Sequence, residues 1–298
     1  MSQERTMPKD FTEIPPQVSE FRRIIRILCG RRVVVFGMIV IMATIIAAIF
    51  APVLAPFHPY KQDLDKALFQ PGQEHLLGTD ALGRDTLSRI IYGTRTSLMV
   101  GIVSIFIAAL IGMTMGLFAG YFGGITNVII MRFIDSLMSF PMMLLALTIA
   151  ALLGGGLKNI MIAIGISLTS VYARLMFGQV LAVKESDYVL AARTIGGNNF
   201  RIMIRHVVPN CFPPLIVLIT MNMGMAILAE AGLSFLGIGI EPPGAAWGAM
   251  VNEGYRYLLK IPILSFAPGF AIMLVVFAFN MVGDGLRDAL DPRLRGSL

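Results

Sequence analysis

Long apolar stretches separated by short polar segments dominate this sequence. The first runs from Val33 to Ala51, 19 residues without a charged side chain. At about 1.5 Å of rise per residue, a helix of this length crosses a hydrocarbon core of about 30 Å. Further stretches of this kind lie at residues 97–121, 133–154, 157–176, 207–236 and 262–282. The pattern predicts an all-α integral membrane protein with six transmembrane helices.

The polar segments between these stretches divide the chain into parts. We expect a cytoplasmic tail and interfacial segment at 1–32, the first transmembrane helix at 33–56, an extracytoplasmic loop at 57–96, a five-helix core at 97–284 and a cytoplasmic C-terminal tail at 285–298. The stretch "FRRIIRILCGRR" alternates basic residues with Ile and Leu. This pattern is typical of a helix lying on the inner leaflet, and a plain basic flank of the first span explains it equally well.

The basic residues predict the orientation of the chain in the membrane. Of 24 lysines and arginines, sixteen fall on the side that carries both termini and eight on the opposite side. Cytoplasmic segments of membrane proteins are enriched in these residues, so both termini are expected in the cytoplasm. The same bias explains the net charge of +6, and no binding of nucleic acid is expected.

Motifs for metal or nucleotide chemistry are missing from the sequence. Cys29 and Cys211 form no CxxC pair, and the three histidines form no HExxH pattern. None of the six lysines is followed by Ser or Thr, as a P-loop requires. We therefore expect no catalytic residue, no metal and no cofactor in this chain, so that any ATP and Mg²⁺ would be bound by a partner subunit.

A few charged residues fall inside the apolar stretches. Arg132 and Asp135 are three residues apart near the cytoplasmic end of the third span and are predicted to form a structural ion pair. Glu230 and Asp284 lie near the ends of their spans, where water and headgroups can reach them. An ion-coupled secondary transporter or channel is an alternative function, and a membrane enzyme is another. The sequence lacks midplane acidic pairs and catalytic constellations, which argues against both.

The segment at 186–206, between the fourth and fifth spans, is polar and contains a Gly-Gly pair. Ser186 or Asp187 can begin a short helix, Gly196 can end it in a left-handed conformation, and Asn198 can begin a second helix that runs to about residue 207. Ala191 and Ala192 would give the first helix a face without bulk. Local physics favours a docking element and a plain connector about equally.

The spacing of Ala191-Ala192, Gly196 and Pro209 resembles the EAA loop in permease subunits of bacterial ABC importers. In that family the loop is a coupling helix that docks on an ATPase subunit. Leu190 stands where the motif has Glu, and His206 stands where it often has Ile. The resemblance implies an ATPase-coupling set of Leu190, Ala191, Ala192, Gly196, Gly197 and Pro209.

A narrower resemblance covers about 220 residues. The segments "HLLGTDALGRDTLSRIIYGTRTSLMVG", "GLFAGYFGG", "MRFIDSLMSFP", "RHVVPN", "LSFLGIGIEPPGAAWGAM" and "NMVGDGLRDALDPRLR" together resemble the C-type permease of the dipeptide/oligopeptide ABC importer family. The resemblance implies a non-hydrolytic subunit with the type I ABC importer permease fold in a bacterial or archaeal inner membrane. It also implies a homologous B-type permease, two ABC ATPase subunits and an extracytoplasmic binding protein as partners. Relatives carry peptides, nickel chelates, glutathione or oligosaccharides, so the cargo stays open.

Two further groups are candidates for roles in transport. Glu241, Pro242, Pro243 and Trp247 are expected in an outer loop, where Trp247 either anchors the chain at the bilayer interface or faces the binding protein. The flexible thioethers of Met221, Met223 and Met225 suit a pathway that passes varied side chains, and they suit core packing equally well.

Overall fold

The protein is a bundle of long helices. The computed structural model describes residues 20–240 and 243–290, so the expected tails at 1–19 and 291–298 lie outside the described residues. Five helical runs are long and apolar enough to cross a membrane. These are α2 (Arg32–Ile49), α4 (Thr86–Phe122), α7 (Gly156–Lys184), the run Asn199–Phe235 and α12 (Ile263–Leu290). They confirm the prediction of an all-α fold with several membrane spans.

The expected third span at 133–154 is not one continuous helix. It is divided between α5 (Gly124–Met138) and α6 (Met142–Leu152), which meet at an angle of 92°. Pro141 at the start of α6 explains the break, because a proline cannot donate to the preceding turn and keeps the residue before it out of the helical conformation. The two helices together supply the sixth candidate span.

The tightest packing joins α4 to α7. Gly112, Gly116 and Gly120 recur at every fourth residue of α4, and a Cβ at any of them would collide with α7. At Gly112 the colliding atoms belong to Thr169 and Tyr172. Small residues at this spacing let two helix backbones approach closely inside a membrane, where packing replaces the hydrophobic effect as the force that joins helices.

The fifth span begins earlier than expected, because the second short helix continues into it. After α8 (Asp187–Thr194), the chain forms α9 (Asn199–Ile202), a π-helical turn (η2, Met203–Val207) and α10 (Val208–Phe235). Pro209 cannot donate a backbone hydrogen bond, and the wider π turn lies where that bond is lost. The Asn210 side chain donates to the carbonyl of His206 at 2.7 Å and satisfies part of the interrupted ladder.

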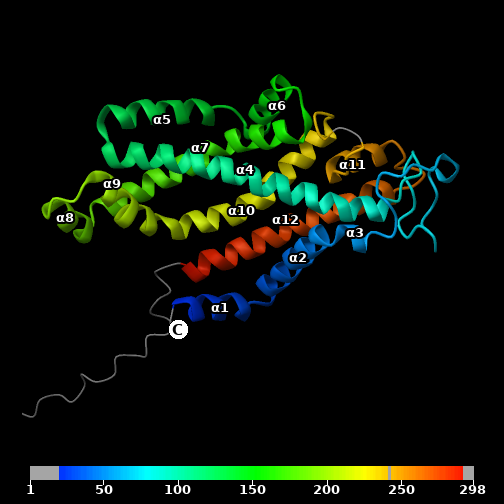
Figure 1. The fold of residues 1–298 in the computed structure, drawn as a ribbon, viewed down its shortest axis with the longest axis horizontal. Coiled ribbons are helices and arrows are strands. Elements are labelled where there is room, and N and C mark those ends of the chain that lie inside the picture. The colour runs from blue at the N-terminus through cyan, green and yellow to red at the C-terminus, as the bar shows by residue number, and fades with distance from the viewer. Residues whose placement is uncertain (1–19, 241–242, 291–298) are drawn as a thin grey trace, which may run out of the picture.

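The remaining elements complete the two ends of the bundle (Figure 1). The short α1 (Glu20–Gly30) precedes α2, which contacts α12 and ends in α3 (Ala51–Leu54). Residues 55–85 form a loop that includes a 3₁₀ turn, η1 (Leu64–Lys66), and this loop lies at the same end as α11 (Trp247–Tyr255). We call this the outer end, and the end formed by α8 and α9 the inner end.

Candidate functional site

At the inner end, α8 packs one side against the bundle. Val189 and Ala192 are buried, and Ile202 of α9 joins them in the main core. Ala191, the neighbour of Ala192, is exposed. Only Ala191 of the two alanines is therefore on the surface of this chain, while Ala192 belongs to its packing.

The turn between α8 and α9 has the geometry expected from its residues. Gly196 has a φ of +80°, and a Cβ there would meet nothing within 4 Å. Gly197 lies against the carbonyl of Ala192, where a Cβ would come within 2.6 Å. The Asn198 side chain accepts a hydrogen bond from the backbone N–H of Phe200 at 3.1 Å and begins α9. The turn was thus predictable from Gly196 and Asn198.

Tyr121, at the inner end of α4, ties this segment to the bundle. Its hydroxyl lies 3.0 Å from Oδ1 of Asn199 and donates to it, and the Arg193 guanidinium stands 5.3 Å from its ring centroid. Nearby, the Lys184 ammonium donates to the carbonyl of Gly120 at 3.1 Å. These contacts join α8 and α9 to the inner end of the long helix α4.

Large apolar side chains stay uncovered on the outward side of this segment. Ile195 is 86% exposed and Phe200 is 67% exposed. Together with Tyr188, Leu190 and Ile204, which are also exposed, they form what we call the inner apolar surface. Exposed apolar side chains concentrated on one segment make that segment a candidate site of interaction with another molecule.

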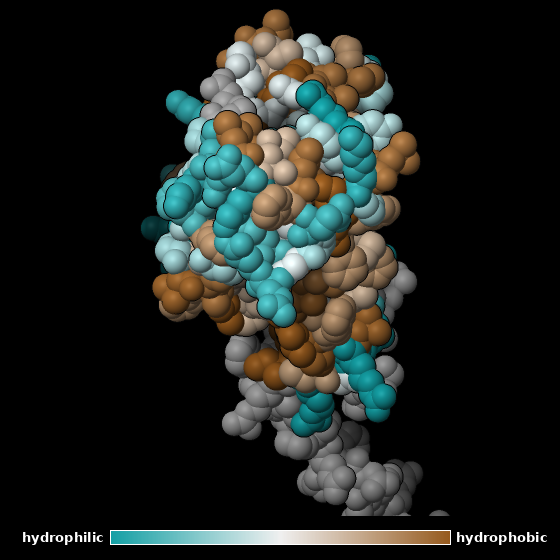
Figure 2. All heavy atoms as spheres, turned by 90° about the vertical axis from the view of Figure 1, so that its right-hand side faces the viewer, coloured by the Kyte–Doolittle hydropathy of each residue, from teal (hydrophilic) through white to brown (hydrophobic). Residues whose placement is uncertain are grey.

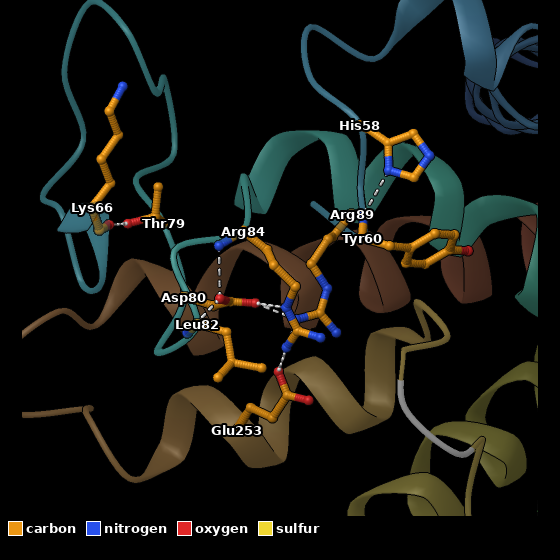
Figure 3. A network of polar contacts seen from close by, with 9 residues as sticks. All are labelled: His58, Tyr60, Lys66, Thr79, Asp80, Leu82, Arg84, Arg89 and Glu253. Carbon is orange, nitrogen blue, oxygen red and sulfur yellow. Dashed lines mark hydrogen bonds and ion pairs between the residues drawn. The ribbon is translucent and has the colours of Figure 1, made fainter. Parts of the chain in front are cut away.

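At the outer end, two arginines and two carboxylates form a network (Figure 3). Asp80 accepts from Nε of Arg84 at 2.6 Å and also pairs with Arg89. Glu253 of α11 accepts from Arg84 at 3.1 Å and from Arg89 at 3.0 Å. Both arginines are buried, so their charges are neutralised within this chain. The network fastens the outer loop and the start of α4 to α11.

The sequence did not reveal this network. The stretch "GTDALGRD" has the turn formers and charges of an aqueous loop, whereas Asp80, Arg84 and Asp85 are buried. Glu253 lies more than 160 residues from either arginine, and no local pattern links residues at that separation. The closely spaced charges in "TDALGRDTLSR" were the only available signal.

Further polar contacts hold the rest of the outer loop. Asp85 begins α4 by accepting from the backbone N–H of Ser88 at 2.8 Å, and its other carboxylate oxygen lies 2.9 Å from Nδ1 of His75. Lys66 pairs with Glu74 on the surface, and their hydrogen bond raises the pKa of Lys66 and lowers the pKa of Glu74.

A pocket of about 250 Å³ opens beside the network. Asp80, Arg84 and Arg89 line it from one side, and Glu253 of α11 and Arg256, the residue after α11, line it from the other. Figure 2 looks onto this end of the molecule and shows hydrophilic residues gathered over it, with apolar residues on the flanks. The outer end is therefore a polar surface with a shallow opening.

Trp247 corrects an expectation about the outer loop. It is buried at the start of α11, where its indole Nε1 donates to the carbonyl of Ile90 at 3.0 Å and its ring lies against Gly93. It is therefore neither a bilayer anchor nor a loop residue facing a partner. Pro243 is exposed, while Glu241 and Pro242 lie outside the described residues.

The three candidate methionines do not share a surface. Met223 is buried and packs toward Gly101 of α4, Met221 lies against Gly283 of α12, and Met225 is exposed. Met223 is two residues from each of the others and therefore points to a different side of the helix. Of the three, only Met225 has the exposure that a pathway residue needs.

Two expectations about charges in the spans are corrected. Asp135 pairs with Arg174 of α7 and not with Arg132, because the neighbouring helix brings a guanidinium to the same face. Glu230 is fully buried and not reached by water, and one of its carboxylate oxygens is 2.6 Å from the Ser234 hydroxyl, which donates to it.

Among the described residues, no group of three or more His, Cys, Asp or Glu side chains could hold a metal ion.

Comparison with known proteins gives two family matches. Residues 112–296 match the model of the binding-protein-dependent transport system inner membrane component, and residues 19–71 match the N-terminal TM domain of oligopeptide transport permease C.

Curated relatives cover nearly the whole chain. A dipeptide transport system permease protein of Alkalihalophilus pseudofirmus is 41% identical, over 93% of this chain and 91% of its own. A glutathione transport system permease protein of Pectobacterium atrosepticum is also 41% identical, over 92% and 90%. A putative peptide transport system permease protein of Brucella suis is 40% identical over 94% and 93%.

Solved structures share the fold at low sequence identity. The MetNI methionine ABC transporter, in an inward-facing conformation, matches with a TM-score of 0.56 and 17% identity, over 68% of this chain and 96% of that chain. An amino acid ABC transporter matches with a TM-score of 0.52 and 13% identity, over 66% and 92%. These likenesses support the type I importer permease fold.

The family sets aside the ion-coupled transporter, the channel and the membrane enzyme as functions. A permease of this family is a non-catalytic component that works together with other components of its transport system. The chain belongs to the binding-protein-dependent transport system inner membrane components, as a multi-pass permease subunit of an ABC importer.

Proposed function

We propose that this permease imports di- or oligopeptides. The observation that carries the proposal is the 40–41% identity, over more than nine tenths of the chain, to permeases named for dipeptide, glutathione and peptide transport. All three names describe molecules with peptide or peptide-like bonds and free carboxylates. The chain would form half of the translocation pathway, and a homologous B-type permease would form the other half.

The energy for transport would come from two ABC ATPase subunits that bind ATP and Mg²⁺. The absence of a P-loop in the sequence supports this division of labour. Purified alone, the chain should hydrolyse no ATP above background, and hydrolysis should begin when the partner subunits are added.

The segment at 186–206 would couple these ATPases to the membrane helices. Three observations support this role: the inner apolar surface, the open approach at Gly196, and the tether between Asn199 and Tyr121. An ATPase groove closing over α8 would bury the apolar side chains, and the tether would pass the movement to α4. Leu190 would contribute apolar contact where the EAA motif has a carboxylate.

The outer end would face an extracytoplasmic binding protein that delivers the peptide. This placement puts both termini in the cytoplasm, as the distribution of basic residues predicts. The buried network at Asp80, Arg84, Arg89 and Glu253 would keep the outer surface rigid for docking. Reporters fused after Leu298 and before Met1 test the orientation, and an external reporter at either end would refute it.

Uptake by the reconstituted system tests the proposed cargo. The chain, its B-type partner, the two ATPases and the binding protein are assembled in vesicles and supplied with labelled dipeptide, tripeptide or glutathione. We expect ATP-dependent accumulation of at least one of these. Accumulation that does not depend on ATP, or an assembly that transports none of the three labelled compounds, would refute the proposal.

A further inference from the structure

An exposed charged stripe runs along α5. Arg132, Asp135, Ser136 and Ser139 are spaced by three, one and three residues, so they share one face of the helix, and all four are exposed. The side of α5 next to this stripe packs against the bundle, where Met131 and Ile134 are buried. Asp135 is joined by Arg174, which reaches the stripe from α7.

The stripe lies inside the apolar zone of the bundle. Gly116 of α4 packs against Ala173, the residue before Arg174, so Arg174 stands at the level of Gly116. The apolar stretch of α4 ends at Tyr121 on the inner side. Gly116 is five residues from Tyr121, so Arg174 lies about 8 Å inside this stretch, measured along the helix axis. Charged side chains at such depth are costly against lipid and normally face protein or a water-filled cavity.

The break in the third span lies directly beyond the stripe. Ser139, Phe140 and Pro141 interrupt the helix between α5 and α6, and all three are exposed. Within a membrane, non-helical backbone is tolerated only where protein covers it or where it lines an aqueous cavity. The break and the charges therefore point independently to a polar environment along this side of α5.

The charges of the stripe do not cancel. Arg174 is paired with Asp135, whereas the Arg132 guanidinium has no hydrogen bond or ion pair with any residue that the structure describes. Its guanidinium offers two parallel donors, the arrangement that matches a carboxylate. The Ser136 and Ser139 hydroxyls donate to carbonyls of their own helix at 2.9 Å and 2.7 Å, so each oxygen is still free to accept. These groups complement a peptide: a carboxylate for Arg132 and amide N–H groups for the serines.

We propose that the α5 stripe lines the translocation pathway and that Arg132 binds the carboxylate of the peptide in transit. This inference rests on the proposed function, since it assumes a peptide cargo. The Asp135–Arg174 pair holds the positions of α5 and α7 around the site, and Arg132 supplies the one unneutralised positive charge. The competing explanation is that a carboxylate of the partner permease covers and pairs with the Arg132 guanidinium in the assembled transporter.

Transport of two forms of one peptide tests the proposal. The complete assembly in vesicles is given a peptide with a free C-terminal carboxylate or its C-terminal amide, both bound by the binding protein. The wild type should carry the free acid faster. Arg132→Gln should slow the free acid by about tenfold, the effect of losing one charge-assisted hydrogen bond, and leave the amide unchanged. Arg132→Lys should keep most of the preference.

The comparison of two peptides within one preparation is independent of the amount of protein inserted. If Arg132→Gln slowed both peptides equally, the proposal would be overturned, and Arg132 would instead pair with a carboxylate of the partner permease. Loss of the partner permease from the Arg132→Gln variant during purification would lead to the same conclusion. Unchanged transport of both would assign the guanidinium to the lipid surface and also overturn it. A wild type that carries neither peptide would refute the proposed function, and this result differs from all the others.

Discussion

The network at the outer end neutralises its charges within the chain, whereas the inner end leaves its apolar surface uncovered. Arg84 and Arg89 are buried beside Asp80, and Glu253 reaches them from α11. Ile195 and Phe200 have no comparable covering. A surface whose groups are already satisfied contributes to the stability of this subunit, and a surface whose groups are unsatisfied contributes when a partner binds. The same kind of substitution should therefore have different consequences at the two ends.

The largest expected effect follows from breaking the outer network. Arg89→Met fills a similar volume but removes a buried positive charge, which leaves Asp80 and Glu253 with one guanidinium between them. Removing one partner of a buried ion pair costs about 3 to 5 kcal/mol. We expect thermal unfolding of the detergent-solubilised protein to begin at a markedly lower temperature.

Glu253→Gln is the matched control for this change. Glu253 is 41% exposed, so water replaces part of what its charge provides, and a smaller cost than that of Arg89→Met is expected. If Arg89→Met were as mild as the control, the outer network would not stabilise the fold.

A smaller effect on stability is expected at the two alanines of α8. Substituting each in turn distinguishes an effect on folding from an effect on docking. Ala192 is buried against this chain, so Ala192→Glu places a carboxylate without a partner among apolar groups. We expect a loss of about 2 to 3 kcal/mol and reduced abundance in the membrane.

Ala191→Glu is the comparison, because Ala191 is exposed. This variant should reach normal membrane abundance but co-purify poorly with the ATPase subunits and transport slowly. Normal co-purification and uptake with Ala191→Glu would show that α8 is a plain connector.

A substitution in the turn at Gly196 should have the next largest effect. A β-branched residue at a φ of +80° is strained by about 1 to 2 kcal/mol, and open space around the position rules out a steric clash within this chain. Gly196→Val should therefore lower stability modestly and impair coupling, seen as ATP hydrolysis without matching uptake. Gly196→Asn should do less, since Asn accepts the left-handed conformation. Equal uptake per ATP in the wild type and Gly196→Val would contradict the proposed role.

The sequence was sufficient for features that depend on neighbouring residues. Apolar length predicted the spans, and Gly196 and Asn198 predicted the turn before α9. Prediction failed where distant segments meet. Arg174 replaced Arg132 as the partner of Asp135 because α7 packs beside α5, and 39 residues separate that pair. Chain proximity alone cannot rank such partners.

The burial of side chains within a helix was also beyond the sequence. Ala191 and Ala192 are identical residues side by side, and only the position of α8 against the bundle decides which is covered. The sequence predicted a role at the surface for Trp247. In the structure its ring is buried, because Gly93 has no side chain and lets the indole pack against α4. Pro141 was visible in the sequence, but the angle of the resulting break depends on how α6 packs.

The smallest effect on stability is expected from the inner apolar surface, and it gives the sharpest contrast between the two ends. Ile195→Ser and Phe200→Ser change side chains that are largely exposed, so each should alter the free energy of unfolding by no more than about 0.5 kcal/mol. If an ATPase subunit covers these side chains, their loss removes buried apolar area from the interface and weakens co-purification and uptake together. Leu259→Ser is the matched control, because Leu259 is fully exposed at the outer end, away from the proposed ATPase contact. It should leave stability and ATPase binding unchanged. If all three variants retained the ATPases equally well, the exposed apolar side chains of α8 and α9 would have no role in docking, and the contrast between the two ends would reduce to a difference in stability alone.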